Sequence, residues 1–178
     1  MLREVPVGPE MEALDLGCGT GLVTLELQPR VRTITGLDGS AGMLARLAEK
    51  ARARGLANVR WLQHDLADAA PLPGRYDLVA SSLTLHHVAD APGLLRRIHA
   101  ALRPGGWLAI ADLEPDGGEF HEDPAGVHHP GFERRELQAW AETAGLGGVR
   151  FAEAARTVKP RPGGPREFGV FLLVARRP

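Results

Sequence analysis

Three glycines at alternate positions follow an apolar run near the start of the chain, in the segment Asp15-Leu16-Gly17-Cys18-Gly19-Thr20-Gly21. Glycine accepts positive φ angles and has no Cβ, so such a turn bends tightly and lets a ligand approach the backbone. Where a strand becomes a helix, free backbone N–H groups and the positive end of the helix dipole attract an anionic ligand group. The segment therefore predicts a nucleotide-type binding turn that presents free N–H groups.

An acidic residue, Asp38, ends the next apolar run about 20 positions beyond this turn. A carboxylate at that place accepts hydrogen bonds from ribose hydroxyls. The dinucleotide fingerprint requires Gly or Ala at position 22, where the chain has Leu22, so a nicotinamide dinucleotide is the weaker prediction. No Lys-Ser or Lys-Thr pair follows the glycines, so a triphosphate-binding P-loop is not supported.

The elements that must hold these residues follow from the hydrophobic periodicity. Short apolar runs alternate with stretches of helical spacing, which is typical of an α/β, doubly wound and mainly parallel sheet. We predict strands at residues 13–16, 31–37, 59–62, 76–81, 107–111, 149–152 and 168–175. Helices are predicted from near Gly21 to Pro29, after the N-cap Ser40, and over two stripes, Leu94-Leu95-Ile98-Leu102 and Leu137-Trp140-Ala141-Ala144. The Ser40 helix carries one apolar face, made of Met43, Leu44, Leu47, Ala48 and Ala51.

Length and charge limit the classes of protein to which this chain can belong. Its 178 residues predict a single domain over 1–178, and 24% charged and 44% hydrophobic residues are ordinary for a globular protein. A net charge of −1 offers no broad attraction to nucleic acid or to an anionic membrane. One cysteine, no signal-peptide pattern and no apolar run of about 20 residues predict a cytoplasmic protein without a membrane span.

Several ordered motifs resemble the class I S-adenosylmethionine-dependent methyltransferases, in particular the branch that acts on small molecules. Besides the glycine turn, these motifs are Gly36-Leu37-Asp38, His64-Asp65-Leu66, Tyr76-Asp77-Leu78-Val79 and Leu102-Arg103-Pro104-Gly105-Gly106. The resemblance implies a Rossmann-like, seven-stranded, mostly parallel sheet of order 3-2-1-4-5-7-6 with helices on both faces. Its last strand would be antiparallel and would lie at residues 168–175.

The same resemblance assigns cofactor-binding roles along the predicted edge of the sheet. Backbone around Gly17, Cys18 and Gly19 would contact the methionyl part of S-adenosylmethionine, and Asp15 would hold its amino group directly or through water. Asp38 and the adjacent Gly39 would lie at the ribose, and Asp65 and Leu66 would meet adenine. Met43 would pack near the adenine ring, and Ser81 would lie near the methionyl group. The product would be S-adenosylhomocysteine.

Four of these residues also have a purely structural interpretation. Asp38 and Asp65 are typical strand-end caps, Met43 fits a helical core stripe, and Cys18 fits a small filler in the turn better than a nucleophile.

Histidines provide the candidates for a general base. His86 follows the fourth predicted strand at the edge where ligands bind in open α/β sheets, although a packing role is equally compatible with that position. His128 and His129 belong to an irregular, Gly-, Pro- and acid-rich stretch at 115–131, which predicts a loop over a site. His121, Glu122, Asp123, His128 and His129 lack a recognised metal-ligand spacing, so we predict no metal site.

The predicted activity is methyl transfer to an O, N or C atom of a small-molecule acceptor. A nucleic-acid base acceptor is disfavoured because Ser81-Ser82-Leu83 replaces the motif that holds a flipped amino base. About a dozen residues precede Ala13, whereas the family usually carries covering helices there. The alternative is therefore a non-catalytic or partner-dependent S-adenosylmethionine-binding module, in which a second copy or another subunit covers an open site.

Overall fold

The computed structural model describes residues 4–178, so the domain boundary expected at residue 1 lies outside the described residues. Its strands are β1 (Glu12–Leu16), β2 (Thr33–Asp38), β3 (Val59–Gln63), β4 (Tyr76–Ser82), β5 (Leu102–Leu113), β6 (Gly147–Lys159) and β7 (Arg166–Arg176). Its α-helices are α1 (Leu22–Leu27), α2 (Ala41–Ala53), α3 (Ala91–Ala101) and α4 (Arg134–Thr143). Two 3₁₀ turns, η1 (Gln28–Arg30) and η2 (Leu85–His87), follow α1 and β4.

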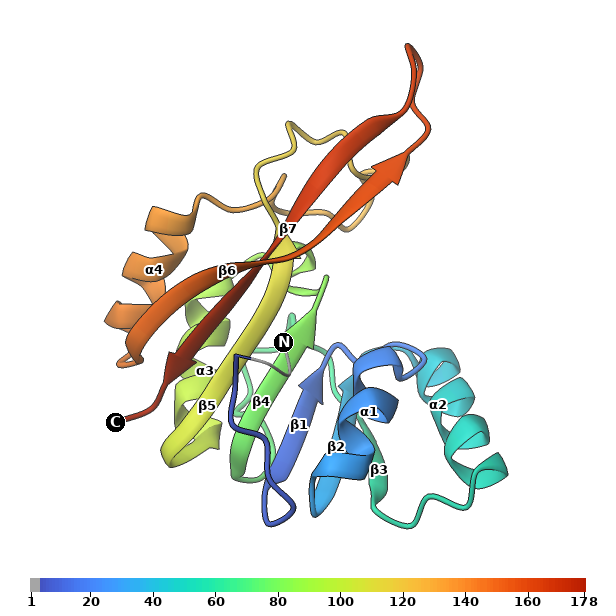
Figure 1. The fold of residues 1–178 in the computed structure, drawn as a ribbon, viewed down its shortest axis with the longest axis vertical. Helices are drawn as coiled ribbons and strands as arrows, with labels where there is room; N and C mark the ends of the chain where they lie inside the picture. Colours follow the sequence, from blue (N-terminus) through green and yellow to red (C-terminus); the bar gives the residue numbers. More distant parts are fainter. Residues whose placement is uncertain (1–3) are drawn as a thin grey trace.

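The seven strands form one sheet of order β3-β2-β1-β4-β5-β7-β6, as the resemblance implied. Strands β1 to β5 pair in parallel, and β7 is antiparallel to both β5 and β6. The carboxyl ends of β1, β2 and β4 therefore meet at one edge, which is uppermost in Figure 1. Parallel strands that end at such an edge place their loops where ligands bind in open α/β sheets.

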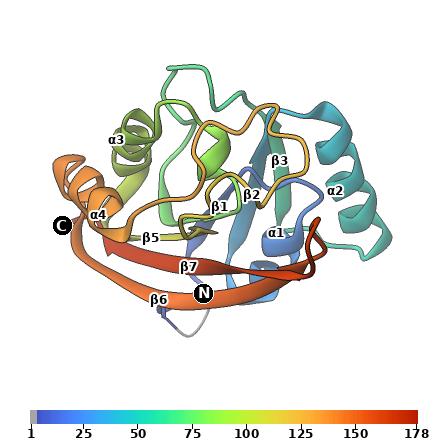
Figure 2. The ribbon, with the colours of Figure 1, turned by 90° about the horizontal axis from the view of Figure 1, so that it is seen from above.

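Both faces of the sheet are covered by apolar packing, but by different helices. On one face α3 and α4 bury Leu95, Ile98 and Leu137 against β4, β5 and β7. On the other face α2 buries Leu44 and Leu47 against β1, β2 and β3, and α1 lies on the same side (Figure 2). Because both faces are apolar, alternate residues of the central strands point into two separate cores, as is typical of buried parallel strands.

Local sequence signals define where the helices begin and end. The Ser40 hydroxyl accepts the Met43 N–H at the start of α2, and the Asp90 carboxylate accepts the Gly93 N–H at the start of α3. Pro92 occupies the first turn of α3, where its missing N–H costs no helical hydrogen bond. After α4, Gly145 adopts a φ of 90° and ends the helix.

Three local expectations differ from the structure. Leu102 opens β5 instead of closing α3, because its N–H still donates to Ile98 while its own backbone is extended. Met43 is 45% exposed and leaves the apolar stripe of α2 to Leu44, Leu47, Ala48 and Ala51. Strands β6 and β7 extend well beyond the apolar runs and pair as a long hairpin through polar positions. Mutual pairing satisfies the backbone there even where the side chains are exposed.

The segment between β5 and α4 has no helix or strand over residues 114–133, in agreement with the predicted loop. Its two ends are held to the sheet: the Phe132 N–H donates to the Leu113 oxygen of β5, and the Glu114 N–H donates to the Gly169 oxygen of β7. Within residues 4–178, no helix combines the length and the apolar character needed to cross a membrane.

Candidate functional site

The glycine turn joins β1 to α1 at the ligand-facing edge of the sheet. Gly17, Gly19 and Gly21 have φ angles of 69°, 51° and 90°, a region that disfavours other residues. At Gly17 a Cβ would lie 2.2 Å from the Thr84 side chain, so the turn packs closely against the segment after β4. This geometry explains why the glycines are required at these positions.

The expectation that this turn presents free backbone N–H groups is wrong for four of its residues. The N–H groups of Gly17 and Cys18 both donate to the Leu37 oxygen, that of Gly21 donates to the Cys18 oxygen, and that of Gly19 donates to Asp38. The parallel pairing of β1 with β2 brings the Leu37 carbonyl and the Asp38 carboxylate to the turn, where they take up these donors. The turn is therefore poorly suited to an anionic ligand group such as a pyrophosphate.

Carboxylates gather beside this turn. Asp38, which is half-buried, accepts the N–H of Gly19 through Oδ2 at 2.8 Å and that of Ser40 through Oδ1 at 2.8 Å. An ionised carboxylate has about four lone-pair sites, so Asp38 retains acceptor capacity for ligand hydroxyls. Asp15 lies beneath the turn, only 1% exposed, and accepts the Thr24 hydroxyl at 2.5 Å.

Burial raises the pKa of Asp15 to about 6, partly offset by hydrogen bonds from Thr24. Because the folded pKa is the higher one, the folded state binds the proton more tightly, and stability is lost as pH rises from about 4 to about 6. We expect Asp15→Asn to remove this loss. Urea unfolding at both pH values measures this effect. The difference in the free energy of unfolding, variant minus wild type, should increase by on the order of 2 kcal/mol from pH 4.5 to pH 7.5.

The difference between the two pH values cancels any pH-independent cost of inserting the amide. Parallel pH dependences for the two proteins would contradict a raised pKa at Asp15.

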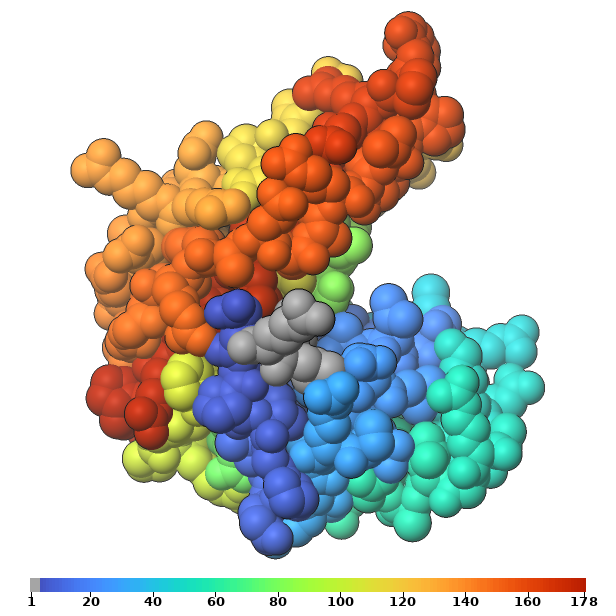
Figure 3. Space-filling view, in the orientation of Figure 1, coloured from blue at the N-terminus to red at the C-terminus, as the bar shows by residue number. Residues whose placement is uncertain are grey.

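A pocket of about 350 Å³ opens above the turn. Ligand pockets commonly have volumes of about 300–1,000 Å³. Figure 3 shows this side of the molecule hollowed by a notch between the β6–β7 hairpin and the part formed by α1 and α2. Predicted site residues line the pocket together with the segment after β4: Gly17, Asp38, Gly39, Asp65, Leu66, Ala67, Leu83, Thr84, His87 and Val88.

The other predicted cofactor residues lie behind or beside the pocket lining. Ser81 is 2% exposed, and its hydroxyl donates to the Leu16 oxygen at 2.8 Å, which ties β4 to β1. Cys18 is buried, and burial raises the pKa of its thiol, so the structure favours a filler over a nucleophile. Gly19 shapes the turn, Asp15 lies below it, and Met43 is exposed on the first turn of α2.

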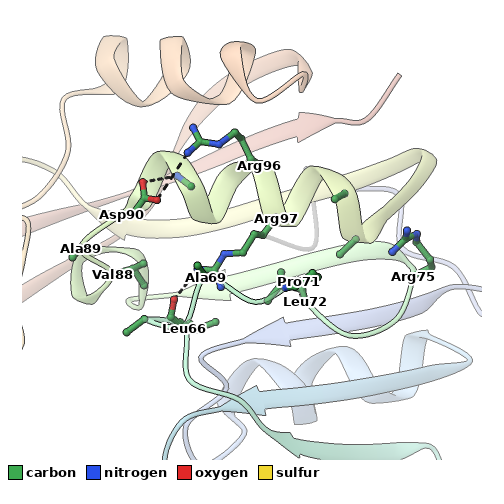
Figure 4. Close-up of a pocket in the computed structure, with 14 residues that line it drawn as sticks. Leu66, Ala69, Pro71, Leu72, Arg75, Val88, Ala89, Asp90, Arg96 and Arg97 are labelled. Carbon is green, nitrogen blue, oxygen red and sulfur yellow. Dashed lines mark hydrogen bonds and ion pairs between the residues drawn. The ribbon is translucent and has the colours of Figure 1, made fainter.

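A larger cavity of about 650 Å³ shares Leu66, Ala67 and Val88 with this pocket and continues between the β3–β4 connection and α3 (Figure 4). The Arg97 guanidinium holds that connection in place by donating to the Leu66, Asp68 and Ala70 carbonyl oxygens. Its walls are mainly small and apolar around this arginine. The residues that line this cavity therefore indicate a ligand less specifically than the residues of the glycine turn do.

A group of histidines borders the pocket on its other side. His86 is 1% exposed, with Nδ1 2.6 Å from Asp112 Oδ1 and Nε2 3.0 Å from His121 Nε2. His87 Nδ1 lies 2.8 Å from the Gly126 oxygen. Burial and the neighbouring imidazoles of His86 and His87 lower the pKa of His121. The loop thus brings His121 to η2, although the two lie 35 residues apart.

The other two candidate bases are arranged differently. The His128 and His129 N–H groups both donate to the His86 oxygen, so the loop lies across η2. The His129 ring contacts the Val88 oxygen at 3.0 Å and packs against Phe132, whereas His128 is exposed. Neither ring lies within the group formed by His86, His87 and His121.

Sequence reasoning missed four residues of this region: Leu83, Thr84, Asp112 and His121 in its contact with His86. Leu83 has a φ of 52°, which is unusual for a branched side chain and is typical of strained backbone at functional sites. Asp112 is fully buried and accepts the Leu85 N–H through Oδ2 and the Leu113 N–H through Oδ1. The signal for Asp112 was an acid that directly follows the apolar run of β5.

The chain matches a family model described as a methyltransferase domain over residues 13–106. A trans-aconitate 2-methyltransferase of Deinococcus radiodurans is 44% identical over 108 residues, which cover 60% of this chain and 39% of that protein. The chain thus spans less than half the length of this relative.

Solved structures share the fold. The YcgJ protein of Bacillus subtilis superposes with a TM-score of 0.79 at 16% identity, covering 98% of this chain and 94% of the other. Phosphoethanolamine N-methyltransferase 2 of Haemonchus contortus, crystallised with S-adenosyl-L-methionine, gives a TM-score of 0.79 at 18% identity, covering 99% and 50%. At these identities the likeness concerns the architecture.

Proposed function

Because the chain belongs to the methyltransferase domain family, within the class I S-adenosylmethionine-dependent methyltransferases, we propose that it transfers a methyl group to a small-molecule acceptor. The observation that carries this proposal is the chemistry of the glycine turn. Its N–H groups are occupied, while Asp15 and Asp38 place negative charge beside it. A ligand with a cationic sulfonium and ammonium and with ribose hydroxyls suits such a site better than a pyrophosphate.

The chain's own residues would bind and orient this cofactor. Asp38 would accept the ribose hydroxyls, with Gly39 beside it, and backbone of Gly17 to Gly19 would contact the methionyl part. Asp15, which lies below the turn, would hold the amino group of the methionyl part directly or through a bridging water. Asp65, whose Oδ1 already accepts the Ala67 N–H, would meet adenine together with Leu66. Ser81 would lie near the methionyl group, and Met43 would pack near the adenine ring.

When bound, S-adenosylmethionine supplies an electrophilic methyl group on its sulfonium sulfur. The acceptor atom would form the new bond to this carbon as the carbon–sulfur bond breaks, and S-adenosylhomocysteine would keep the electron pair of the broken bond. The protein contributes mainly by aligning the two reactants, since positioning alone supplies several kcal/mol of barrier lowering, about 7–11 kcal/mol in favourable cases.

Removal of a proton from the acceptor would fall to the histidines beside the pocket. His87 lines the pocket, and His86 is buried behind it with both ring nitrogens in contact. His128 and His129 do not line the pocket above the glycine turn, and we propose them as acceptor-side residues. The relative named trans-aconitate 2-methyltransferase supports a small-molecule acceptor. We propose an O, N or C atom of that acceptor as the methylated atom.

The pocket is open, which supports a partner or a second copy as its cover. The loop at 115–131 lies across η2, and Met43 and Leu83 remain 45% and 38% exposed. Water in an open site weakens internal electrostatics, so closure favours turnover. The single buried cysteine supports a reducing, cytoplasmic setting.

Calorimetric titration with S-adenosylhomocysteine, with NAD in parallel, tests the cofactor before any acceptor is chosen. We expect micromolar binding of S-adenosylhomocysteine and none of NAD. Binding of NAD alone would overturn the proposal. Tight binding without methyl loss across a broad acceptor panel would instead favour a non-catalytic, partner-dependent module.

A further inference from the structure

Three imidazoles from two distant parts of the chain converge beside the pocket. His86 and His87 belong to η2, and His121 belongs to the loop between β5 and α4. One ring nitrogen of each lies within 4.8 Å of the other two, and the ring centres are 4.2, 5.0 and 5.3 Å apart. We propose that this histidine cluster, His86, His87 and His121, is a binding site for a divalent metal ion of the zinc class.

The partners of the other ring nitrogens support this assignment. His86 Nδ1 faces a fully buried carboxylate, Asp112, whose two oxygens already accept backbone N–H groups. His87 Nδ1 faces the Gly126 carbonyl. Each acceptor holds a proton on Nδ1 and leaves the lone pair on Nε2. Metal-binding histidines almost always have such a carboxylate or carbonyl behind them, which fixes the tautomer and the ring orientation.

The spacing of the nitrogens fits a shared ion. Two imidazole ligands at about 2.0–2.1 Å from a tetrahedral zinc ion lie roughly 3.3 Å apart. The His86 and His121 Nε2 atoms are 3.0 Å apart and share one proton, so ion binding requires His121 to carry its proton on Nδ1 instead and the two rings to separate slightly. His87 is exposed and His121 lies on an irregular loop, so small shifts of both side chains, with the Nδ1 contact of His87 to Gly126 kept, close the remaining distance.

The charges that face the cluster are of both signs. Asp112 lies behind His86, and Asp116, which is 5% exposed, lies in the same loop as His121. Lys159 is a cation whose charge acts on His121, but its ammonium donates to the Phe120 oxygen at 3.0 Å and lies 3.5 Å from the centre of the Phe120 ring. Its charge is therefore engaged by two partners, and the buried carboxylates compensate a bound dication.

Three nitrogen ligands and an open fourth position favour zinc, cobalt, nickel or copper over magnesium or calcium, which prefer oxygen ligands. The sequence alone pointed away from a metal because it offered only the loop residues His121, Glu122, Asp123, His128 and His129. The fold replaces that set by joining His121 to two histidines from η2.

The test uses the tag-free full-length chain, treated with EDTA, desalted, and titrated at pH 7.5 with CoCl₂ and with ZnCl₂. Cobalt binding is followed by visible absorption and zinc binding by calorimetry. We expect one equivalent of each ion, and at least a tenfold loss of affinity in His87→Ala and in His121→Ala. Both side chains are at least partly exposed, so these variants should fold.

His128→Ala is the matched control, because it removes an exposed imidazole from the same loop and should leave the affinity unchanged. Equal affinities in wild type and His121→Ala, or an equal loss in His128→Ala, would overturn the proposal. The titration contains no S-adenosylmethionine, so its outcome is independent of the methyl-transfer proposal.

Discussion

Replacing Asp38 with alanine should weaken S-adenosylhomocysteine binding by on the order of 30- to 1,000-fold, or about 2–4 kcal/mol. The Asp38 carboxylate lines the pocket and is the group that we propose accepts the ribose hydroxyls, and hydrogen bonds to charged groups contribute about 1.5–3 kcal/mol each. It also ties the glycine turn to the start of α2, because it accepts the N–H groups of Gly19 and Ser40. Calorimetry on the wild type and the variant measures the loss.

Asp68→Ala is the matched control. Asp68 also accepts a backbone N–H two residues ahead, from Ala70, but it is exposed and does not line the pocket. We expect its affinity for S-adenosylhomocysteine to equal that of the wild type.

A ligand that lacks the ribose 2′-hydroxyl separates the two roles of Asp38. If the carboxylate binds the ribose, Asp38→Ala should cost the deoxy analogue much less affinity than the natural ligand. An equal loss for both ligands would assign Asp38 to the ordering of the turn alone. Unchanged binding of both would remove Asp38 from the site.

The parts of the fold predicted from sequence are those that local patterns determine. An apolar strand that ends at Leu16 and is followed by alternating glycines specifies its own turn, and Ser40 specifies the start of α2. The sheet order and the antiparallel β7 came from the family resemblance, and the structure confirms both. The full length of β6 could not be predicted from hydrophobic periodicity. Many of its side chains are polar, and backbone pairing with β7 holds the strand in place.

The parts of the site that sequence did not predict depend on contacts between distant residues. The glycine turn looks free of internal hydrogen bonds until β2 places the Leu37 oxygen and Asp38 against it. Likewise, the 35 residues between His86 and His121 carry no periodicity that would join them. Met43 shows the opposite case: helical spacing predicted burial, but the side chain lies on the first turn of α2 and is 45% exposed, so among residues 4–178 no element covers it.

Asp112→Ala should lower the free energy of unfolding by roughly 3–5 kcal/mol, the cost of breaking a buried charged hydrogen-bond group by removing one partner. Its carboxylate is fully buried and serves three donors, the N–H groups of Leu85 and Leu113 and the Nδ1 side of His86. An alanine leaves all three without a protein partner in a site that water does not reach. Urea unfolding in the presence of EDTA measures this cost without any contribution from metal.

The same substitution at Asp90 provides the comparison, because this aspartate also accepts a backbone N–H, from Gly93, but at the exposed start of α3. Loss of such a helix cap costs about 1 kcal/mol. Asp112→Asn should fall between the two, since the amide keeps one acceptor oxygen for a backbone N–H group. A cost at Asp112 no larger than that at Asp90 would mean that η2 and the end of β5 rearrange to satisfy the three donors. In that case Asp112 would not be the residue that fixes His86.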